Sequence, residues 1–202
     1  MRRAQSHDTR GRGVRGASVF LVGFMGAGKT SVGRTLSEYL NWEFEDLDER
    51  IERREKRTVA EIFHDSGEAG FRRAEHDALR DLLTQLRAGA VKVVALGGGA
   101  FVQQENADLL KASGLPTVFL DAPVQELWQR CSRQASDSGA ERPLLRSIEQ
   151  FRELHAERRK HYLTATLRVD TASRTFEEIA AEIADRLGLK KVDIRVHEGE
   201  VE

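Results

Sequence analysis

A lysine and a threonine follow a glycine-rich segment near the start of the chain. Residues 23–30 read GFMGAGKT and match the phosphate-binding pattern G-x-x-x-x-G-K-[S/T] at every fixed position. Glycines let backbone N–H groups converge on an anion, Lys29 can reach the β- and γ-phosphates of a nucleotide, and Thr30 can ligate Mg²⁺. A chance glycine turn would match in only about one chain in a hundred. The segment therefore predicts a nucleotide-binding site, without naming a reaction.

Two carboxylates, Asp46 and Asp48, end a segment in which apolar and polar residues alternate. The alternation over residues 42–48 predicts a short strand, and residues two apart on an extended chain project from one face. Like charges placed together are costly without a cation or a donor between them. A solvated strand end with acidic helix-capping residues is the alternative interpretation. Beside a phosphate loop, the pair favours one carboxylate near Mg²⁺ and another that orients an acceptor hydroxyl.

Three consecutive glycines follow an apolar segment in the middle of the chain. Residues 91–96 predict a buried strand, and Gly97, Gly98 and Gly99 come directly after it. Glycine lets a ligand touch the backbone, and the carboxyl ends of parallel strands are where open α/β sheets bind their ligands. The alternative interpretation is a plain loop. In a parallel sheet, the glycines would face a ligand.

Several arginines are candidates for binding an anionic substrate. Arg72 and Arg73 stand near the start of a helix expected over residues 69–87, and because adjacent helical residues point in different directions, we expect only one to face a ligand. The polar segment 134–145 contains Arg142 and is the candidate for a mobile lid. A passive surface loop would have the same composition.

Composition limits the class of protein. A chain of 202 residues, 40% of them hydrophobic, suits one compact domain, and a net charge of −1 gives no overall field that favours nucleic acid. The single Cys131 excludes an intramolecular disulfide, and we expect it to pack rather than react. No apolar run approaches the ~20 residues that a membrane span needs. We therefore expect a cytoplasmic monomer without nucleic-acid or membrane partners.

Strand and helix patterns alternate along the chain. Buried strands are expected at residues 19–22, 42–48, 91–96, 117–121 and 167–170. Helices are expected at 29–40, 49–57, 58–65, 69–87, 106–111, 123–133, 151–163 and 176–187, with a break at 66–68. The alternation predicts a three-layer α/β/α fold around a parallel sheet of about five strands.

The domain boundaries follow from the same patterns. We expect a basic, disordered arm over residues 1–17, which carries five arginines, and a charged, frayed tail over 190–202. One domain with the phosphate loop would occupy 18–189, with its lid at about 131–147. No internal repeat is visible.

Together these motifs resemble those of shikimate kinases, which are small-metabolite kinases with the P-loop kinase fold. The resemblance runs from about residue 18 to 189 and rests on an ordered set rather than on the phosphate loop alone. The set is GFMGAGKT at 23–30, DLD at 46–48, FRR at 71–73 with Glu75, GGG at 97–99, RPLL at 142–145, and Arg158 four residues before Tyr162.

The resemblance implies transfer of the γ-phosphoryl group of MgATP to the 3-hydroxyl of shikimate, on the pathway to chorismate and aromatic amino acids. It assigns catalytic roles to Lys29, Asp48 and Arg142, and Mg²⁺ to Thr30 and Asp46. The nucleotide would be bound by Gly26, Ala27, Gly28, Lys29, Thr30, Ser31, Arg130 and Arg142, with Arg130 against the adenine. Shikimate would be bound by Asp48, Arg72, Gly97, Gly98, Gly99 and Arg158. The resemblance implies that Arg72 and Arg158 contact its carboxylate and that Asp48 contacts its hydroxyls.

Two other functions compete with this one. A related small-metabolite kinase, such as a gluconate kinase, would share the phosphate loop but has no need of two arginines aimed at a ring carboxylate. A non-catalytic shikimate-sensing domain would lack catalytic groups, whereas this chain keeps Lys29, Asp46, Asp48 and Arg142. An assay with shikimate, gluconate and no acceptor would separate these functions.

Overall fold

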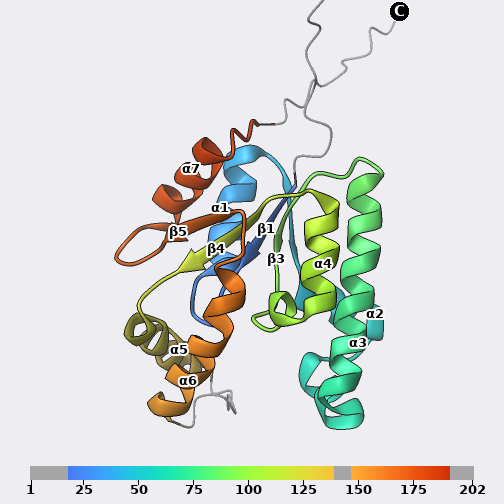
Figure 1. Cartoon of the computed structure of the whole chain (residues 1–202), viewed down its shortest axis with the longest axis vertical. Coiled ribbons are helices and arrows are strands. Elements are labelled where there is room, and N and C mark those ends of the chain that lie inside the picture. Colours follow the sequence, from blue (N-terminus) through green and yellow to red (C-terminus); the bar gives the residue numbers. More distant parts are fainter. Residues whose placement is uncertain (1–17, 139–146, 192–202) are drawn as a thin grey trace, which may run out of the picture.

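The computed structural model describes residues 18–138 and 147–191, with the backbone alone for residues 135–138. Five strands form one parallel sheet in the order β2-β3-β1-β4-β5 (Figure 1). The strands are β1 (Val19–Val22), β2 (Glu43–Asp46), β3 (Lys92–Ala95), β4 (Thr117–Asp121) and β5 (Leu167–Asp170). The sequence-based prediction of a parallel sheet of about five strands is confirmed.

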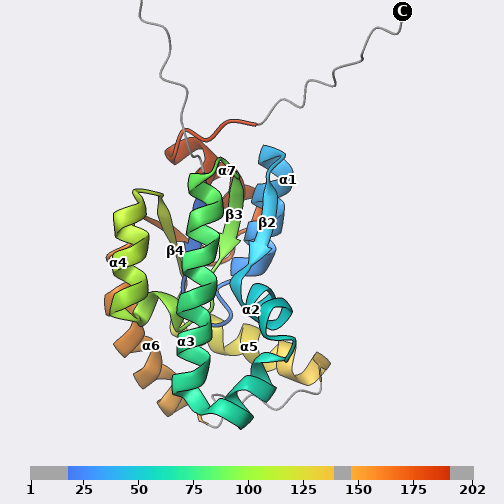
Figure 2. The same cartoon turned by 90° about the vertical axis from the view of Figure 1, so that its right-hand side faces the viewer.

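Helices cover both faces of the sheet. They are α1 (Lys29–Leu40), α2 (Leu47–Glu55), α3 (Val59–Arg87), the 3₁₀ turn η1 (Ala100–Val102), α4 (Gln104–Ser113), α5 (Val124–Ser138), α6 (Ile148–Tyr162) and α7 (Phe176–Arg186). Helices α1 and α4 lie on opposite faces, with α7 packed beside α1 and α3 beside α4 (Figure 2). The expected three layers are therefore present.

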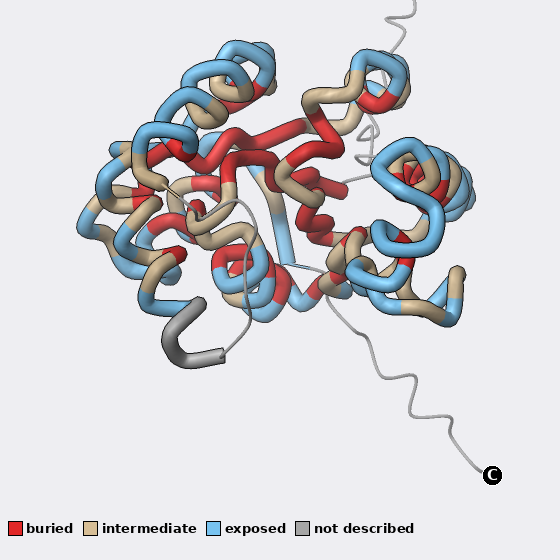
Figure 3. Tube along the Cα trace, turned by 90° about the horizontal axis from the view of Figure 1, so that it is seen from below, coloured by how far each residue is buried: buried red, intermediate tan, exposed pale blue. Residues whose placement is uncertain are grey.

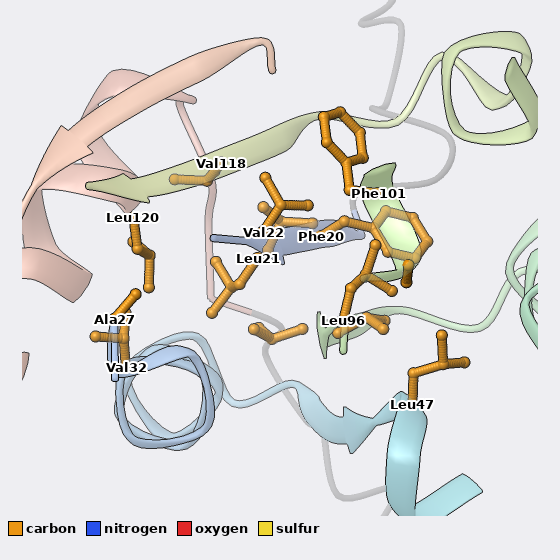
Figure 4. Packing of buried hydrophobic residues seen from close by; sticks show 14 of the residues in the cluster. Phe20, Leu21, Val22, Ala27, Val32, Leu47, Leu96, Phe101, Val118 and Leu120 are labelled. Carbon is orange, nitrogen blue, oxygen red and sulfur yellow. The ribbon is translucent and has the colours of Figure 1, made fainter. Parts of the chain in front are cut away.

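The core is centred on β1, whose four residues are all buried. Phe20, Leu21 and Val22 pack among apolar side chains from β4, from the segment after β3 and from α1 (Figure 4). Figure 3 shows the buried residues concentrated in the central strands, with exposed residues on the surrounding helices. Because all strands run the same way, their carboxyl ends meet at one edge of this rigid core, and the loops that leave this edge are held close together.

Several predicted boundaries differ from the structure, and two of them lie beside the candidate site. Strand β2 ends at Asp46 rather than at Asp48, because the Asp46 side chain accepts a hydrogen bond from the Asp48 backbone and caps α2. The two carboxylates are therefore not on one face of a strand. Helix α5 continues to Ser138 instead of ending near Arg133, so the first residues of the predicted lid are helical.

The predicted break in the long helix is confirmed. Gly67 has a φ of 64° and a ψ of −177°, which interrupts α3 between its capped first part and the part that carries Arg72. Thr58 and Glu61 form the predicted capping box at the start of α3. None of the helices within residues 18–138 and 147–191 combines the length and the apolar character needed to cross a bilayer.

Candidate active site

The phosphate loop connects β1 to α1 at the carboxyl edge of the sheet. Gly26 and Gly28 have φ angles of 77° and 86°, which favour glycine, and a Cβ on Gly26 would lie 2.8 Å from Cys131 Sγ. Helix α1 begins at Lys29, so its N-terminal N–H groups face the loop. A cavity of about 270 Å³ beside the loop is lined by Met25, Gly26, Gly28, Lys29, Thr30, Ser31, Asp46, Asp48, Leu96, Gly97, Gly98 and Gln134.

The Lys29 ammonium lies across the phosphate loop. Its Nζ donates to the carbonyl oxygens of Gly23 and Phe24 at 2.9 and 3.0 Å. Burial lowers the pKa of Lys29, and the charges of Asp48 and Asp46 oppose that effect. The two carboxylates therefore help to keep this buried amine protonated, which it must be in order to contact phosphate oxygens.

Thr30 and Asp46 form an oxygen pair at the mouth of the same cavity. The Thr30 hydroxyl donates to Asp46 Oδ2 at 3.0 Å, and Asp46 Oδ1 accepts from the Asp48 backbone N–H at 3.0 Å. Hydroxyl and carboxylate oxygens are the ligands that Mg²⁺ prefers, and this ion is often bound by one or two such groups together with phosphates and waters. Elsewhere in the described residues, no group of three or more His, Cys, Asp or Glu side chains could hold a metal.

Asp48 lies in the first turn of α2, between the phosphate loop and the glycine run. Its Oδ1 is buried without a hydrogen-bond partner, and it lies 2.8 Å from where a Cβ on Gly97 would be. Burial, with a further contribution from Asp46, raises the pKa of Asp48 to about 6, against the lowering effect of Lys29. This carboxylate is therefore an available hydrogen-bond acceptor next to the phosphate site.

Arg72 approaches the glycine run from α3. Its guanidinium donates to Glu75 Oε2 at 2.9 Å and to Glu68 Oε1 at 3.1 Å, and both of its Nη atoms lie 2.6 Å from where a Cβ on Gly99 would be. Arg73 is exposed, so only one of the two adjacent arginines faces the site, as predicted.

Glu75 is fully buried beneath Arg72, and no site role was predicted for it. Burial raises the pKa of Glu75 to about 7, while the Arg72 charge and hydrogen bond lower it. Its Oε1 lacks a hydrogen-bond partner. The signal in the sequence was its spacing of three from Arg72, which places both side chains on one face of a helix.

Arg158 approaches the glycine run from the opposite side, on α6. Its Nη1 lies 3.7 Å from where a Cβ on Gly98 would be, and its Cζ lies 5.9 Å from the centre of the Phe24 ring. Tyr162, one turn later, is buried and donates a hydrogen bond to the Gly98 carbonyl. Burial raises the pKa of Tyr162 to about 12. The motif contained Tyr162, but its contact with Gly98 was not predicted.

Arg130 occupies the other end of the phosphate loop, on α5. It donates to the Gly26 carbonyl at 3.4 Å and to the Thr171 carbonyl at 2.9 Å, and it pairs with Glu126. A cavity of about 420 Å³ beside it is lined by Pro123, Gln125, Glu126, Gln129, Arg130, Arg133 and Ser173. Within the phosphate loop, Ala27 is buried, and Ser31 in the first turn of α1 lines the phosphate cavity. Arg142, the predicted lid cation, lies outside the described residues.

The fold thus gathers groups from six elements at one edge of the sheet. A cradle for phosphates and a carboxylate with a free acceptor atom share one cavity, and two arginines flank the glycine backbone next to it. Such an arrangement provides positioning and positive charge rather than a covalent nucleophile, which is what phosphoryl transfer requires.

Comparisons with known proteins agree with this geometry. A model of the shikimate kinase family matches residues 25–188. The shikimate kinase of Geobacter metallireducens is 40% identical over 173 residues, which are 84% of this chain and 91% of that protein. The solved structure of the Acinetobacter baumannii shikimate kinase in complex with shikimate is 36% identical, with a TM-score of 0.74, and the match covers 85% of this chain and 92% of that one.

Other similarities are partial or weaker. The chain is 39% identical over 176 residues to the bifunctional shikimate kinase/3-dehydroquinate synthase of Thermotoga maritima, but it spans only 33% of that protein. A gluconokinase from Sinorhizobium meliloti is 19% identical with a TM-score of 0.53, a likeness of fold alone. From the matched motifs, the fold and these relatives, the chain belongs to the shikimate kinase family.

Proposed function

We propose that this chain transfers the γ-phosphoryl group of ATP to the 3-hydroxyl of shikimate. The observation that carries the proposal is the position of Asp48, which shares a cavity with Lys29 and Thr30 and also contacts the glycine run that Arg72 and Arg158 flank. An acceptor bound on that run would present a hydroxyl to Asp48 next to the phosphate site. Family membership supports the same reaction.

Shikimate is a ring that carries a carboxylate and three hydroxyls, and the site offers partners for both kinds of group. Arg72 and Arg158 would bind the carboxylate, since a planar guanidinium matches a carboxylate with two parallel hydrogen bonds. The backbone of Gly97, Gly98 and Gly99 would lie along the ring. The Asp48 carboxylate would accept from the 3-hydroxyl and hold its oxygen for attack on the γ-phosphorus. It would take the proton as the new P–O bond forms and the bond to the β-phosphate oxygen breaks, so that ADP leaves.

The phosphate loop would bind the nucleotide. Backbone N–H groups of residues 26–31 and the Lys29 ammonium would contact the phosphate oxygens, and Arg130 would lie on the side of the base. Thr30 and Asp46 fit a Mg²⁺ ion, which would neutralise charge on the β- and γ-phosphate oxygens. Arg142 keeps the role that the resemblance implies, stabilising the transferring phosphoryl group from the segment after α5.

The alternatives are less well supported. Gluconate also carries a carboxylate, but on an open chain rather than on a ring that could lie along the glycine run, and the gluconokinase similarity extends only to the fold. A sensing domain would not need the pair of Thr30 and Asp46 or the buried Lys29, all of which are in place here.

A coupled assay of ADP release tests the proposal. We expect turnover with ATP, Mg²⁺ and shikimate, and only background release with gluconate or without an acceptor. Phosphorus NMR of the product should show a phosphate ester at the 3-position. A Lys29→Met variant, purified in the same way, controls for contaminating kinases. Turnover of gluconate in preference to shikimate, or shikimate binding without ADP release, would contradict the proposal.

A further inference from the structure

Helix α6 carries Arg158 and buries few of its side chains. Of its fifteen residues, only Phe151 and Tyr162 are buried. These two residues lie on one face because eleven residues make just over three full turns. At about 100° per residue, Arg158 lies about 40° to one side of Tyr162, and Arg159 about 60° to the other. A rotation of α6 that frees Arg159 would therefore also move Arg158.

Arg159 is fixed by an aspartate at the end of β4. Its Nη2 donates to Asp121 Oδ2 at 2.7 Å, and its Nε lies 3.5 Å from Asp121 Oδ1. The Asp121 side chain is only 6% exposed, so its charge is poorly solvated and depends on its partners. A second arginine, Arg168 on β5, forms an ion pair with the same Oδ2 atom at 2.8 Å but is not part of α6.

The backbone of Asp121 is held by hydrogen bonds and lies next to the phosphate loop. Its carbonyl oxygen accepts from the Thr171 N–H at 2.8 Å and from the Thr171 hydroxyl at 3.2 Å. The carbonyl oxygen of the preceding Leu120 lies 2.7 Å from where a Cβ on Gly23 would be, so the end of β4 touches the start of the loop. A helix anchored to Asp121 therefore has a fixed position relative to the phosphate loop.

We propose that Asp121 is a positioning residue for the substrate: through Arg159 it fixes the rotation of α6, and so places Arg158 against Gly98. This inference rests on the proposed function, because it assumes that Arg158 binds the acceptor carboxylate. Asp121 touches neither substrate in this scheme. Its effect should therefore appear in the KM for shikimate, with little effect on the KM for ATP.

The two arginines that share Asp121 Oδ2 provide a matched pair of variants. Arg159→Gln should raise the shikimate KM by about 5- to 20-fold and change the ATP KM by less than about twofold. Arg168→Gln loses an ion pair to the same atom at nearly the same distance. It should leave the KM values for shikimate and ATP within about twofold of those of the wild type. Arg159→Lys, which keeps the charge, should restore most of the shikimate affinity. Melting temperatures of all variants separate loss of stability from loss of position.

The contact between Asp121 and Arg159 should behave as one unit. Asp121→Asn should raise the shikimate KM about as much as Arg159→Gln, and the double variant should be no worse than either single variant. Multiplied effects in the double variant, or an equal rise in KM from Arg168→Gln, would overturn the proposal. So would an unchanged shikimate KM in folded Arg159→Gln. If the wild-type chain did not phosphorylate shikimate at all, the proposed function would fail first, which the same assay shows separately.

Discussion

Burial makes two carboxyl groups of the site harder to ionise. Asp48 and Glu75 each have one buried oxygen without a partner, and burial is the largest cause of the raised pKa of both carboxyls. Buried polar atoms without partners destabilise a fold, so their presence together at one site is typical of a function that needs free acceptors.

Asp48→Asn should abolish turnover and stabilise the fold. An amide is a poor acceptor for a hydroxyl proton, so we expect kcat to fall on the order of 10²-fold or more, with ATP binding retained. The pKa of Asp48 is raised from 3.8 to about 6, a shift worth about 3 kcal/mol, and the ionised form is the destabilised one. Because Asp48 is only partly buried, a gain of about 1–2 kcal/mol is expected above pH 6.

The pH dependence of that gain provides its control. The penalty for ionised Asp48 is absent below the unfolded pKa of 3.8 and complete above about 6. Melting temperatures should therefore differ between wild type and Asp48→Asn at pH 7.5 and converge near pH 4. Near wild-type turnover in the variant would remove Asp48 from the mechanism, and a lower melting temperature at pH 7.5 would contradict the electrostatic argument.

Glu75 should make shikimate binding depend on pH near neutrality. Its pKa is raised to about 7, so it is ionised above that pH and loses its charge as the pH falls through it. Protonated Glu75 no longer pairs fully with Arg72, and the shikimate KM should rise from pH 8 to pH 6. In Glu75→Gln the KM should be raised at every pH, without this transition. If the shikimate KM of Glu75→Gln changed as much between pH 8 and pH 6 as that of the wild type, the pH dependence would belong to another group.

Arg158→Lys should weaken shikimate binding selectively. Lysine keeps the charge but loses the planar fork, so we expect a loss of about 1.5–3 kcal/mol, read as a higher shikimate KM with the ATP KM little changed. The position of Arg158, between Gly98 and the Phe24 ring, supports this assignment. A rise in the ATP KM alone would place Arg158 at the nucleotide instead.

At the scale of elements, strands were easier to predict than the junctions between strands and helices. The bounds of β1 and β4 agree with the prediction because buried parallel strands are short apolar runs that end abruptly. The bounds of β5, which alternates buried and exposed residues, also agree. The turn after Asp46 was missed because alternation continues in the sequence to Asp48, while the backbone is turned there by a cap that only the three-dimensional structure shows. Local capping prevailed over the periodic pattern.

The site was predicted in its main residues but not in its supporting ones. Motifs with a fixed spacing identified Lys29, Arg72 and Arg158, which approach a common cavity or the glycine run beside it. Tyr162 and Asp121 were not predicted, because each acts through contacts with residues far away in the sequence. No periodicity or composition indicates which distant carbonyl or guanidinium a buried polar group will meet.

The kink in α3 should depend on Gly67. Its φ of 64° with a ψ of −177° lies in a region that only glycine adopts readily, and a Cβ there would meet no atom within 4 Å. Gly67→Ala should therefore destabilise the fold through backbone conformation alone, by about 1–3 kcal/mol. Since about 2–4 °C corresponds to 1 kcal/mol in a chain of this size, the melting temperature should fall by about 2–12 °C.

Gly114→Ala is the control for the kink. Gly114 also has open space around its Cα, but its φ of 71° and ψ of 3° are ordinary left-handed values, where alanine costs about 1–2 kcal/mol. We expect a smaller loss there and no effect on the shikimate KM. Gly67→Ala should also raise that KM, because the kink sets the direction of the half of α3 that carries Arg72. Equal melting temperatures for Gly67→Ala and wild type would show that α3 tolerates a straight path.

At the scale of the whole molecule, the substrate groups are divided between two sides of the sheet edge. Asp48, Arg72 and Glu75 lie on α2 and α3, whereas Arg158 and Tyr162 lie on α6, and the glycine run after β3 separates them (Figure 1). In the proposed binding mode, Asp48 and Arg72 contact the ring from one side and Arg158 from the other. The rigid parallel sheet is what keeps both sides at a fixed separation, and the core around β1 therefore contributes to binding as well as to stability.

Residues at both ends of the described part of the chain form hydrogen bonds within the domain. We therefore expect the functional unit to extend from about residue 18 to about residue 191. Ser18 accepts from the Lys92 backbone at 3.0 Å, and the Leu189 backbone donates to Ala184 at 2.9 Å beyond the end of α7. A shortened chain of residues 18–191 should therefore match the full chain in melting temperature within about 2 °C and in shikimate KM within about twofold.

A chain of residues 18–186 is the matched control. It loses Leu187 and Leu189, which pack against the core, and should melt at a clearly lower temperature. Loss of shikimate turnover in a stable 18–191 chain would instead assign a role in the reaction to the basic arm or the charged tail.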